Sequence, residues 1–384
     1  MSTSLERLGI STLGMDGGRS GIGRYTLSVL GEMARLRPEW RVDVVGQGAD
    51  QHLFGELPAA WRWISVSRRT RGALREILWT QTGLRRLARR RGWQAAFLPA
   101  GNRRLPYDLP CPAVGTVHDL STLHVADKYD PLRRLYIVRV LPALIRRLDR
   151  AITVSRASAR DLEDHAGVDD RRIDVVLNGV TPRPVAPAPE ARSRVAGALG
   201  IREPWMLYIS RLEHPGKNHL RLIDAYERLV DADRDVPHRL VLAGADWSGS
   251  EVVHGRIAAS PLADRIVTTG FVESDLLHDL LDGAGLLVFP SLYEGFGLPV
   301  LEAMAAGVPV ACSDRSSLPE VAGEAAFYFD PDDPASICSG MASALAGGEG
   351  RRRKVDVGRR RAAELTWRRA AERTVSSLER AARS

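Results

Sequence analysis

Apolar residues along this chain fall into two alternating kinds of stretch. Short, nearly continuous runs of Val, Ile, Leu and Ala are typical of strands buried on both faces of a parallel sheet. Longer stretches repeat apolar positions at helical spacing, as an amphipathic helix does. The strands predicted in this way span residues 8–13, 40–45, 95–99, 112–117, 151–155, 172–177, 205–209, 239–243, 266–269, 285–290, 308–311 and 327–330. The predicted helices span 26–35, 68–91, 135–148, 220–229 and 300–306, with others following Ser155 and Arg156 and starting at Pro334, and a tail helix over 359–382.

The alternation of strands and helices, interrupted once, predicts two α/β domains with parallel sheets. The interruption is the proline-rich segment 181–190, TPRPVAPAPE, which has the composition of a linker. We therefore expect an N-terminal domain over 1–180, and the linker with the start of the second domain over 181–200. The second domain should span 201–365, followed by a final helix over 366–384. A chain of 384 residues has enough material for two or three domains.

The most informative stretch, residues 288–320, combines a buried strand, a glycine-rich loop and a short helix. Unpaired backbone N–H groups and the helix dipole at such a helix start favour an anion, for example a diphosphate. Two carboxylates bracket this position, Glu294 in the loop and Glu302 on the helix. Carboxylates accept hydrogen bonds from hydroxyls, so the pair suits a polyol such as a ribose or a hexose. The alternative is that Glu302 only complements the helix dipole and Glu294 is a solvated loop residue.

Two basic residues follow the predicted strand 205–209. Arg211 and Lys217 lie close to the start of the next helix, where two cations could neutralise a leaving diphosphate. As isolated basic residues they would be ordinary surface positions.

The first half of the chain carries two weaker signals. His118 and Asp119 end the strand 112–117, and the carboxyl ends of parallel strands are where open α/β sheets bind ligands. A structural histidine is the alternative. Gly21 and Gly23 belong to a glycine-rich segment before the helix 26–35, in the order G-x-x-G-x-G rather than the dinucleotide fingerprint. A plain loop would explain them equally well.

The segment 290–310, PSLYEGFGLPVLEAMAAGVPV, closely resembles the signature of the family 4 retaining glycosyltransferases, which have the GT-B fold. The segment 210–218 is similar to that family's G-R-L…K-N motif, with Ser210 in place of the commoner glycine, and HDLS at 118–121 is similar to a further family segment. The resemblance implies two facing Rossmann-like parallel-sheet domains, with the last helix crossing back to the first domain. It spans nearly the whole chain and is strongest over 205–320.

The resemblance also implies a role for each matching residue. Glu294 would contact the donor sugar and Glu302 the nucleotide ribose, while the nucleotide base would lie against the turn at Val272. The catalytic residues implied are His118, Asp119, Arg211, Lys217 and Glu294. The donor-binding residues implied are Gly21, Gly23, Ser210, Val272, Gly295, Phe296, Gly297, Leu298 and Glu302.

The reaction expected from this resemblance is transfer of a sugar from an NDP-sugar to an acceptor hydroxyl, with retention at the anomeric carbon. We expect a front-face displacement that needs no metal and no other cofactor. The HDLS segment favours mannose from GDP-mannose, and the acceptor would be a lipid-linked oligosaccharide or a small molecule. Two alternatives stay open: a nucleotide-sugar epimerase on a similar fold, and a non-catalytic nucleotide-sugar-binding partner.

Composition narrows the choice of partners. The net charge of +7 would suit anionic lipid, nucleic acid or phosphorylated substrates. No nucleic-acid-binding motif accompanies the charge, and aromatic residues are not interleaved with the basic runs, so we expect no nucleic acid partner. The segment 68–91 predicts a basic helix that either packs on the core or contacts an anionic membrane. Its apolar residues are predicted to form one stripe: Leu74, Ile77, Leu78, Leu84 and Leu87.

The remaining signals indicate a cytoplasmic protein, either free or peripheral at the inner face of the membrane. The N-terminus has no signal-peptide pattern, and no apolar run has membrane-spanning length. Cys111, Cys312 and Cys338 lack the spacing of a metal or disulfide site. A D-x-D sequence at 231–233 lies in a polar connection, where we do not expect a metal.

Overall fold

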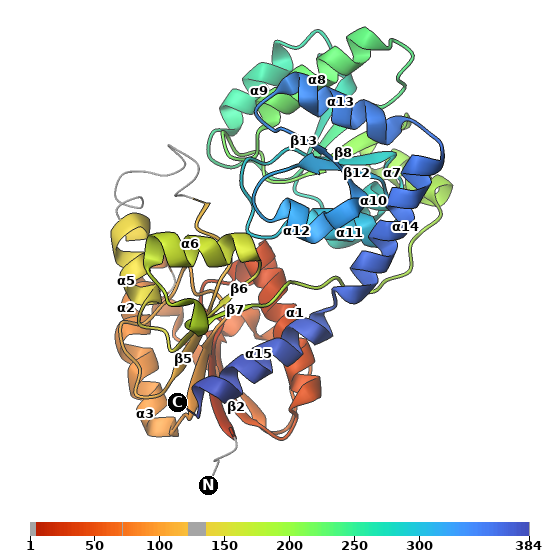
Figure 1. The fold of residues 1–384 in the computed structure, drawn as a ribbon. Coiled ribbons are helices and arrows are strands. Elements are labelled where there is room, and N and C mark those ends of the chain that lie inside the picture. Colours follow the sequence, from red (N-terminus) through yellow and green to blue (C-terminus); the bar gives the residue numbers. More distant parts are fainter. Residues whose placement is uncertain (1–4, 71, 122–135, 384) are drawn as a thin grey trace. The chain divides into compact units, whose positions relative to one another are not determined.

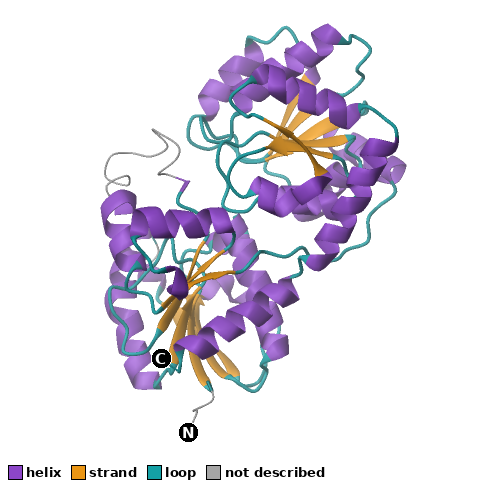
Figure 2. Cartoon of the chain, in the orientation of Figure 1, coloured by secondary structure: helices purple, strands orange, loops and turns teal. Residues whose placement is uncertain are grey.

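The computed structural model describes residues 5–70, 72–121 and 136–383. These residues divide into two compact units (Figure 1). The described residues up to Gly179, together with those from Leu365 onward, form the N-terminal unit, and Val180–Glu364 form the C-terminal unit. Figure 2 shows a central sheet covered by helices in each unit.

The N-terminal unit is built on a seven-stranded parallel sheet with the order β3-β2-β1-β4-β5-β6-β7. The chain winds outward from β1 in one direction and then, from β4, in the other, which is a doubly wound topology. The central strands are almost fully buried because helices cover both faces. The strands are β1 (Arg7–Ser11), β2 (Arg41–Gln47), β3 (Trp61–Val66), β4 (Ala95–Leu98), β5 (Ala113–Val117), β6 (Arg150–Thr153) and β7 (Ile173–Val175).

The C-terminal unit repeats this plan with a six-stranded parallel sheet in the order β10-β9-β8-β11-β12-β13. The winding direction reverses between β8 and β11, which are neighbours in the sheet. The carboxyl ends of these two strands therefore form the switch point at which doubly wound sheets bind ligands. The strands are β8 (Trp205–Ile209), β9 (Arg239–Ala243), β10 (Ile266–Gly270), β11 (Leu286–Phe289), β12 (Val310–Ser313) and β13 (Ala326–Phe329).

Amphipathic helices join the strands in both units, and their apolar faces pack on the sheets. The N-terminal unit has α1 (Gly21–Leu36), α2 (Ala73–Trp79), α3 (Arg85–Arg91), α5 (Leu141–Ile145), α6 (Arg156–Ala166) and α15 (Trp367–Ala381). The C-terminal unit has α7 (Ala188–Leu199), α8 (His219–Ala232), α9 (Ser250–Ala258), α10 (Ser274–Asp282), α11 (Leu298–Ala306), α12 (Leu318–Ala322), α13 (Pro334–Leu345) and α14 (Glu349–Glu364).

The last helix belongs to the N-terminal unit, where α15 packs against α1. Trp367 and Leu378 are buried on its apolar side, as predicted. Two parallel-sheet domains and a returning final helix are therefore confirmed. The tail helix predicted over 359–382 is wrong in one respect, because the chain breaks it in two. The Thr366 hydroxyl accepts a hydrogen bond from the Arg369 N–H and caps a new helix there.

Two other predicted helices differ from the structure, and one strand was not predicted. Helix α1 starts at Gly21 rather than residue 26, because the Ser20 hydroxyl accepts a hydrogen bond from the N–H of Gly23 and caps the helix. The edge strand β3 was not predicted, since its residues are only partly buried and show no clear alternation. The helix predicted over 135–148 begins at a residue outside the described ones and continues as a π-helical turn, Tyr136–Val140, before α5.

The basic segment 68–91 is not one helix with one apolar stripe. A π-helical turn, Thr80–Leu84, separates α2 from α3 and rotates the face that each presents to the core. Leu84 is consequently buried, whereas Leu74 and Leu78 on α2 are 76% and 67% exposed. No helix among the described residues combines the length and apolarity needed to cross a bilayer.

Candidate functional site

The candidate site of the C-terminal unit lies at the switch point of its sheet. The chain leaves β8 through the segment 210–218 and leaves β11 through the loop 290–297, and each segment leads into a helix. Because β8 and β11 are adjacent and parallel, these two segments emerge side by side at the same edge of the sheet. This brings together two stretches that are far apart in the chain.

An ion pair between Lys217 and Glu294 joins the two segments. The Lys217 Nζ lies 2.6 Å from the Glu294 Oε1, and the two side chains are only 17% and 15% exposed. Burial lowers the pKa of Lys217 and is the largest single effect, but the attraction and hydrogen bond of Glu294, with Tyr208 and Glu213, together outweigh it and raise the pKa of Lys217. Lys217 is therefore charged at neutral pH. The structure thus brings two of the predicted catalytic residues into direct contact.

Hydrogen bonds hold both segments in place around this pair. The buried Tyr208 hydroxyl donates to the Lys217 carbonyl oxygen at 2.8 Å and lies 3.1 Å from the Ser291 Oγ. The Asn218 side-chain amide donates to the carbonyl oxygens of Pro290 and Pro331, at 3.0 and 2.7 Å. These contacts satisfy the polar groups of a buried turn, so the site has a rigid framework.

The backbone of Glu294 is fixed from a third direction by the segment that follows β12. The Ser316 Oγ accepts a hydrogen bond from the Glu294 N–H at 2.9 Å. The Ser317 Oγ donates to the Glu294 carbonyl oxygen at 2.9 Å. Glu294 is therefore held at both backbone groups while its carboxylate meets Lys217.

The N-terminus of α11 lies immediately after Glu294. Gly297 precedes the helix with φ of 96°, a conformation that disfavours a side chain, and no side chain caps the helix. A Cβ at Gly297 would also lie 2.6 Å from a methyl group of Leu318. Gly295, Phe296 and Gly297 are buried, Leu298 is partly exposed, and the dipole of α11 is positive at this end. Glu302 lies on the second turn of α11 and is partly exposed.

Arg211 has a different environment from Lys217. Its guanidinium donates to the Glu213 carboxylate at 3.0 Å, and the Arg211 side chain is 42% exposed while that of Glu213 is 1% exposed. The guanidinium carbon also lies 4.6 Å from the centre of the Trp247 ring. Arg211 thus combines a buried anionic partner with an open side.

Two other predicted donor-binding residues lie on the same sheet edge. The Ser210 Oγ is 3.2 Å from the Nε2 of His219, the first residue of α8. Burial lowers the pKa of His219 to about 4, so this histidine is neutral at physiological pH. Val272 lies in the connection after β10 and is partly exposed.

The predicted residues of the N-terminal unit occupy the carboxyl end of β5. His118 is buried; its Nε2 lies 2.8 Å from the Pro99 carbonyl oxygen, and its ring meets the Tyr25 ring edge-on at 4.7 Å. Burial lowers the pKa of His118 to about 4, which outweighs the opposite effect of the bond to Pro99. His118 is therefore a neutral hydrogen-bonding group. The Asp119 carboxylate accepts hydrogen bonds from the N–H and hydroxyl of Ser121.

Gly21 and Gly23 lie in the first turn of α1. Gly21 is exposed. A Cβ at Gly23 would lie 2.5 Å from the Met15 carbonyl oxygen and 2.6 Å from the Gly18 Cα, so Gly23 lets the preceding loop fold onto the helix. Its observed role is in packing.

Sequence reasoning did not single out several residues that build the site. Glu213 lies inside the recognised motif, but its burial could not be read from the sequence. Trp247, Ser316 and Ser317 lie in connections with no motif, and only the tertiary structure brings them to Arg211 and Glu294.

Within the described residues, no group of three or more His, Cys, Asp or Glu side chains is arranged to hold a metal ion. Asp231 lies near the end of α8, and the Asp233 carboxylate accepts a hydrogen bond from the Asp235 N–H at 3.0 Å. The three cysteines are free thiols.

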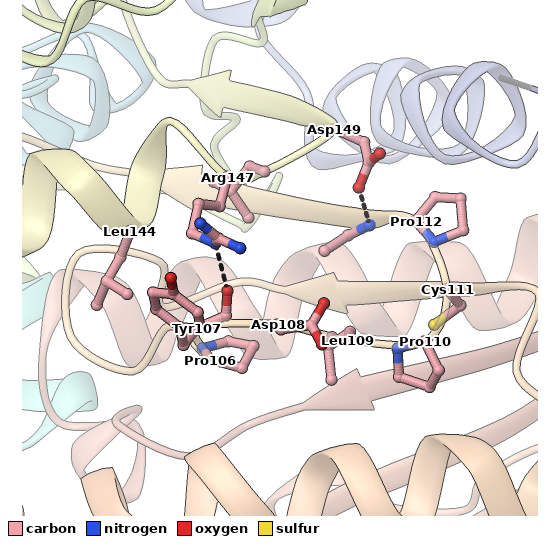
Figure 3. A pocket seen from close by; sticks show the side chains of 12 residues that line it. Pro106, Tyr107, Asp108, Leu109, Pro110, Cys111, Pro112, Leu144, Arg147 and Asp149 are labelled. Atoms are coloured by element: carbon pink, nitrogen blue, oxygen red, sulfur yellow. Dashed lines mark hydrogen bonds between the residues drawn. The ribbon is translucent and has the colours of Figure 1, made fainter.

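A cavity of about 660 Å³ in the N-terminal unit lies apart from these residues (Figure 3). It is lined by the segment 106–113 and by Leu144, Arg147 and Asp149, with Arg147 above the Tyr107 ring. Ala113 is the first residue of β5, whereas His118 follows its last residue. The cavity is therefore at the opposite end of that strand.

Comparison with known proteins identifies both units. The family model described as "Glycosyl transferases group 1" matches residues 192–361, and that described as "Glycosyltransferase Family 4" matches residues 19–183.

Among curated relatives, the O-antigen chain mannosyltransferase B of Escherichia coli is 38% identical over 141 residues, covering 37% of this chain and 36% of that protein. The MMP alpha-(1->4)-mannosyltransferase of Mycolicibacterium hassiacum is 32% identical over 238 residues, covering 59% and 54%. The chain thus aligns with between a third and just over half of the length of these two relatives.

Among solved structures, HepE of Anabaena in complex with UDP and glucose superposes with a TM-score of 0.74 at 17% identity, covering 97% of this chain and 99% of that one. This likeness shows that the two chains share a fold.

Proposed function

Since this chain belongs to the group 1, family 4 glycosyltransferases and has their GT-B fold, we propose that it transfers a hexose from an NDP-sugar to an acceptor hydroxyl with retention. The observation that carries this proposal is the ion pair of Lys217 and Glu294 at the switch point of the second sheet. It places a cation suited to a diphosphate and a carboxylate suited to sugar hydroxyls 2.6 Å apart.

The pair is proposed to exchange its partners when the donor binds. The diphosphate offers Lys217 a stronger anion than one carboxylate, and the sugar hydroxyls offer hydrogen bonds to the carboxylate of Glu294. Both halves of the pair are then satisfied by one molecule. A nucleoside diphosphate without a sugar would satisfy only Lys217, so the site favours the intact donor.

Catalysis is proposed to proceed on one face of the sugar. The bond from the anomeric carbon to the phosphate oxygen breaks, the acceptor oxygen bonds to the same face, and the acceptor proton passes to the leaving phosphate. Arg211, Lys217 and the N–H groups of 295–298 would stabilise the charge that develops on the diphosphate, so no metal is needed. Glu302 is proposed to hold the ribose, and the turn at Val272 the base.

His118 and Asp119 are proposed to contact the transferred sugar from the N-terminal unit. The low pKa of His118 argues against a role as general base, because such a group is a weak proton acceptor at neutral pH. A neutral imidazole can still donate or accept a hydrogen bond to a hydroxyl.

The donor we propose is GDP-mannose, supported by the mannosyltransferases among the relatives. UDP-glucose is the first alternative. Thermal unfolding with a panel of NDP-sugars tests the choice, since a ligand at one hundred times its Kd stabilises by about 2.7 kcal/mol. Stabilisation by GDP-mannose and not by UDP-sugars is the expected result, and the reverse would overturn the donor assignment.

Product analysis distinguishes a transferase from an epimerase and from a non-catalytic binding partner. Incubation with the stabilising donor and pooled acceptors should give an α-linked product from an α-linked donor. The anomeric configuration is assigned from the one-bond C1–H1 coupling in NMR. An epimerase would release free sugar or nucleotide without any acceptor. A non-catalytic binding partner would bind the donor and leave it intact.

The acceptor is proposed to be lipid-linked, with a small-molecule acceptor as the alternative. Leu74 and Leu78 lie one helical turn apart on α2, both largely exposed, beside the exposed Arg75. Such a surface suits an anionic bilayer.

Co-sedimentation with vesicles of phosphatidylglycerol and phosphatidylcholine tests this surface. Binding should fall in Leu74→Ser/Leu78→Ser and persist in a control, Val252→Ser, at an exposed position on α9 of the other unit. Equal binding by the wild type and both variants would remove α2 as the contact. Absence of vesicle binding by the wild type at low salt would favour a soluble acceptor.

A further inference from the structure

We propose that Glu213 and Trp247 are positioning residues that together orient Arg211 for its contact with the donor diphosphate. This inference rests on the proposed function, because it assigns Arg211 to the leaving group. It adds two residues to which neither the family motifs nor the comparisons give a role.

The contacts of Arg211 restrict its guanidinium in two directions. The Glu213 carboxylate accepts a hydrogen bond from the Nη2 at 3.0 Å and so occupies one edge. The Trp247 ring covers one face, with 4.6 Å between the guanidinium carbon and the ring centre. Another edge and the opposite face are left, and the side chain is 42% exposed. The planar group can therefore present a fixed pair of N–H donors to a phosphate.

Burial of Glu213 makes its carboxylate a firm partner for Arg211. Its side chain is 1% exposed, and a carboxylate so far from water needs a cation to offset the loss of hydration. Arg211 supplies that charge while remaining partly exposed itself. The buried Glu213 thus holds the guanidinium in place, and the partly exposed Arg211 can still contact a ligand.

Trp247 owes its position to backbone pairing. The segment after β9 runs beside the segment after β8, with backbone hydrogen bonds from Leu212 N–H to Ala245 O, from Trp247 N–H to Leu212 O, and from His214 N–H to Ser248 O, at 3.0, 3.0 and 3.1 Å. These bonds set the ring on Arg211, although the indole is 47% exposed. The contact with the Arg211 guanidinium lies on the face of this ring.

The test compares wild type with Trp247→Phe, Trp247→Leu, Arg211→Ala and the double variant Arg211→Ala/Trp247→Leu. Trp247→Leu removes the π face and keeps an apolar side chain, whereas Trp247→Phe keeps an aromatic face. We expect Trp247→Leu to lower kcat about 3- to 30-fold with a smaller rise in donor KM, since the contact with the leaving diphosphate strengthens in the transition state. Trp247→Phe should recover most of the loss.

The decisive result is the double variant. If Trp247 acts through Arg211, Trp247→Leu has no further effect once Arg211 is alanine. Additive losses would overturn the inference and indicate that the indole contacts the donor directly. Equal kcat in wild type and Trp247→Leu would also overturn it.

Glu213→Gln tests the other positioning residue. The amide keeps the shape and a hydrogen-bond acceptor but loses the charge, so we expect a fall in kcat that also disappears in the Arg211→Ala background. Donor turnover by the wild type is measured first: its absence would refute the proposed function, whereas an active wild type with uncoupled variants refutes only the positioning role.

Discussion

The ion pair between Lys217 and Glu294 leads to a test that does not depend on activity. Lys217→Met keeps an unbranched side chain but leaves the Glu294 carboxylate, which is 15% exposed, without its cation. Breaking a buried pair costs about 3–5 kcal/mol in the free energy of unfolding, and breaking an exposed pair about 0–1 kcal/mol. Because both side chains are mostly but not fully buried, we expect a loss of about 2–3 kcal/mol.

Glu294→Gln should lose a comparable amount, since it leaves the Lys217 ammonium without an anion. The double variant Lys217→Met/Glu294→Gln buries no unpaired charge and should lose no more than either single variant, about 2–3 kcal/mol, so the two changes are coupled by about 2–3 kcal/mol. The measurement is equilibrium unfolding in urea. The free energies of unfolding of the wild type and the variants are compared for the transition of the C-terminal unit, because the two units need not unfold together.

Arg368→Met is the matched control. Arg368 pairs with Glu372 on α15, where the two side chains are 68% and 48% exposed, so its loss should stay below about 1 kcal/mol. A loss below about 0.5 kcal/mol in Lys217→Met, or a double variant whose loss equals the sum of the singles, would refute the argument that this pair is buried and coupled.

Three further outcomes are expected. Glu302→Ala should raise the donor KM with kcat largely kept, whereas Glu294→Ala should lower kcat more than it raises KM. Each effect should be about ten- to a hundredfold. A loss of donor affinity alone in both variants would contradict the division of roles. The free energy of unfolding should decrease as the pH is lowered from about 6.5 to about 4. The reason is that burial lowers the pKa values of His118 and His219 to about 4 in the folded chain, so over this range the unfolded chain binds protons that the folded chain does not. His118→Asn should remove roughly 3 kcal/mol of that fall, measured by urea unfolding at each pH, and an unchanged slope would show that His118 titrates normally. Donor turnover should persist in EDTA, and activity that is lost there and restored by Mn²⁺ would implicate the D-x-D residues 231–233.

Much of the fold could be predicted because buried parallel strands are continuous apolar runs bounded by turn residues. The bounds of β8 and β9 agree with the prediction to the residue. Prediction failed where local pattern and tertiary contact disagree. The edge strand β3 is too exposed to show the pattern, and the π-helical turn Thr80–Leu84 shifts the face of a helix without any mark in its apolar spacing.

For the candidate site, too, some features could be read from the sequence and others only from the tertiary structure. The sequence by itself indicated which loops could form a site, because glycine, proline and charged residues at the ends of apolar runs are local features. It also determined the family, since the motifs at 205–320 are contiguous in the chain. The roles proposed for the individual residues stay predictions until they are measured.

Only the tertiary structure decided which of these residues meet. Lys217 contacts Glu294 because β8 and β11 are neighbours in the sheet although separated in the chain. Trp247 reaches Arg211 because the segments after β8 and β9 pair through their backbones. Strand order and backbone pairing depend on the packing of the whole unit. The burial that keeps His118 neutral and the contact with Glu294 that keeps Lys217 charged exist only once that packing has formed.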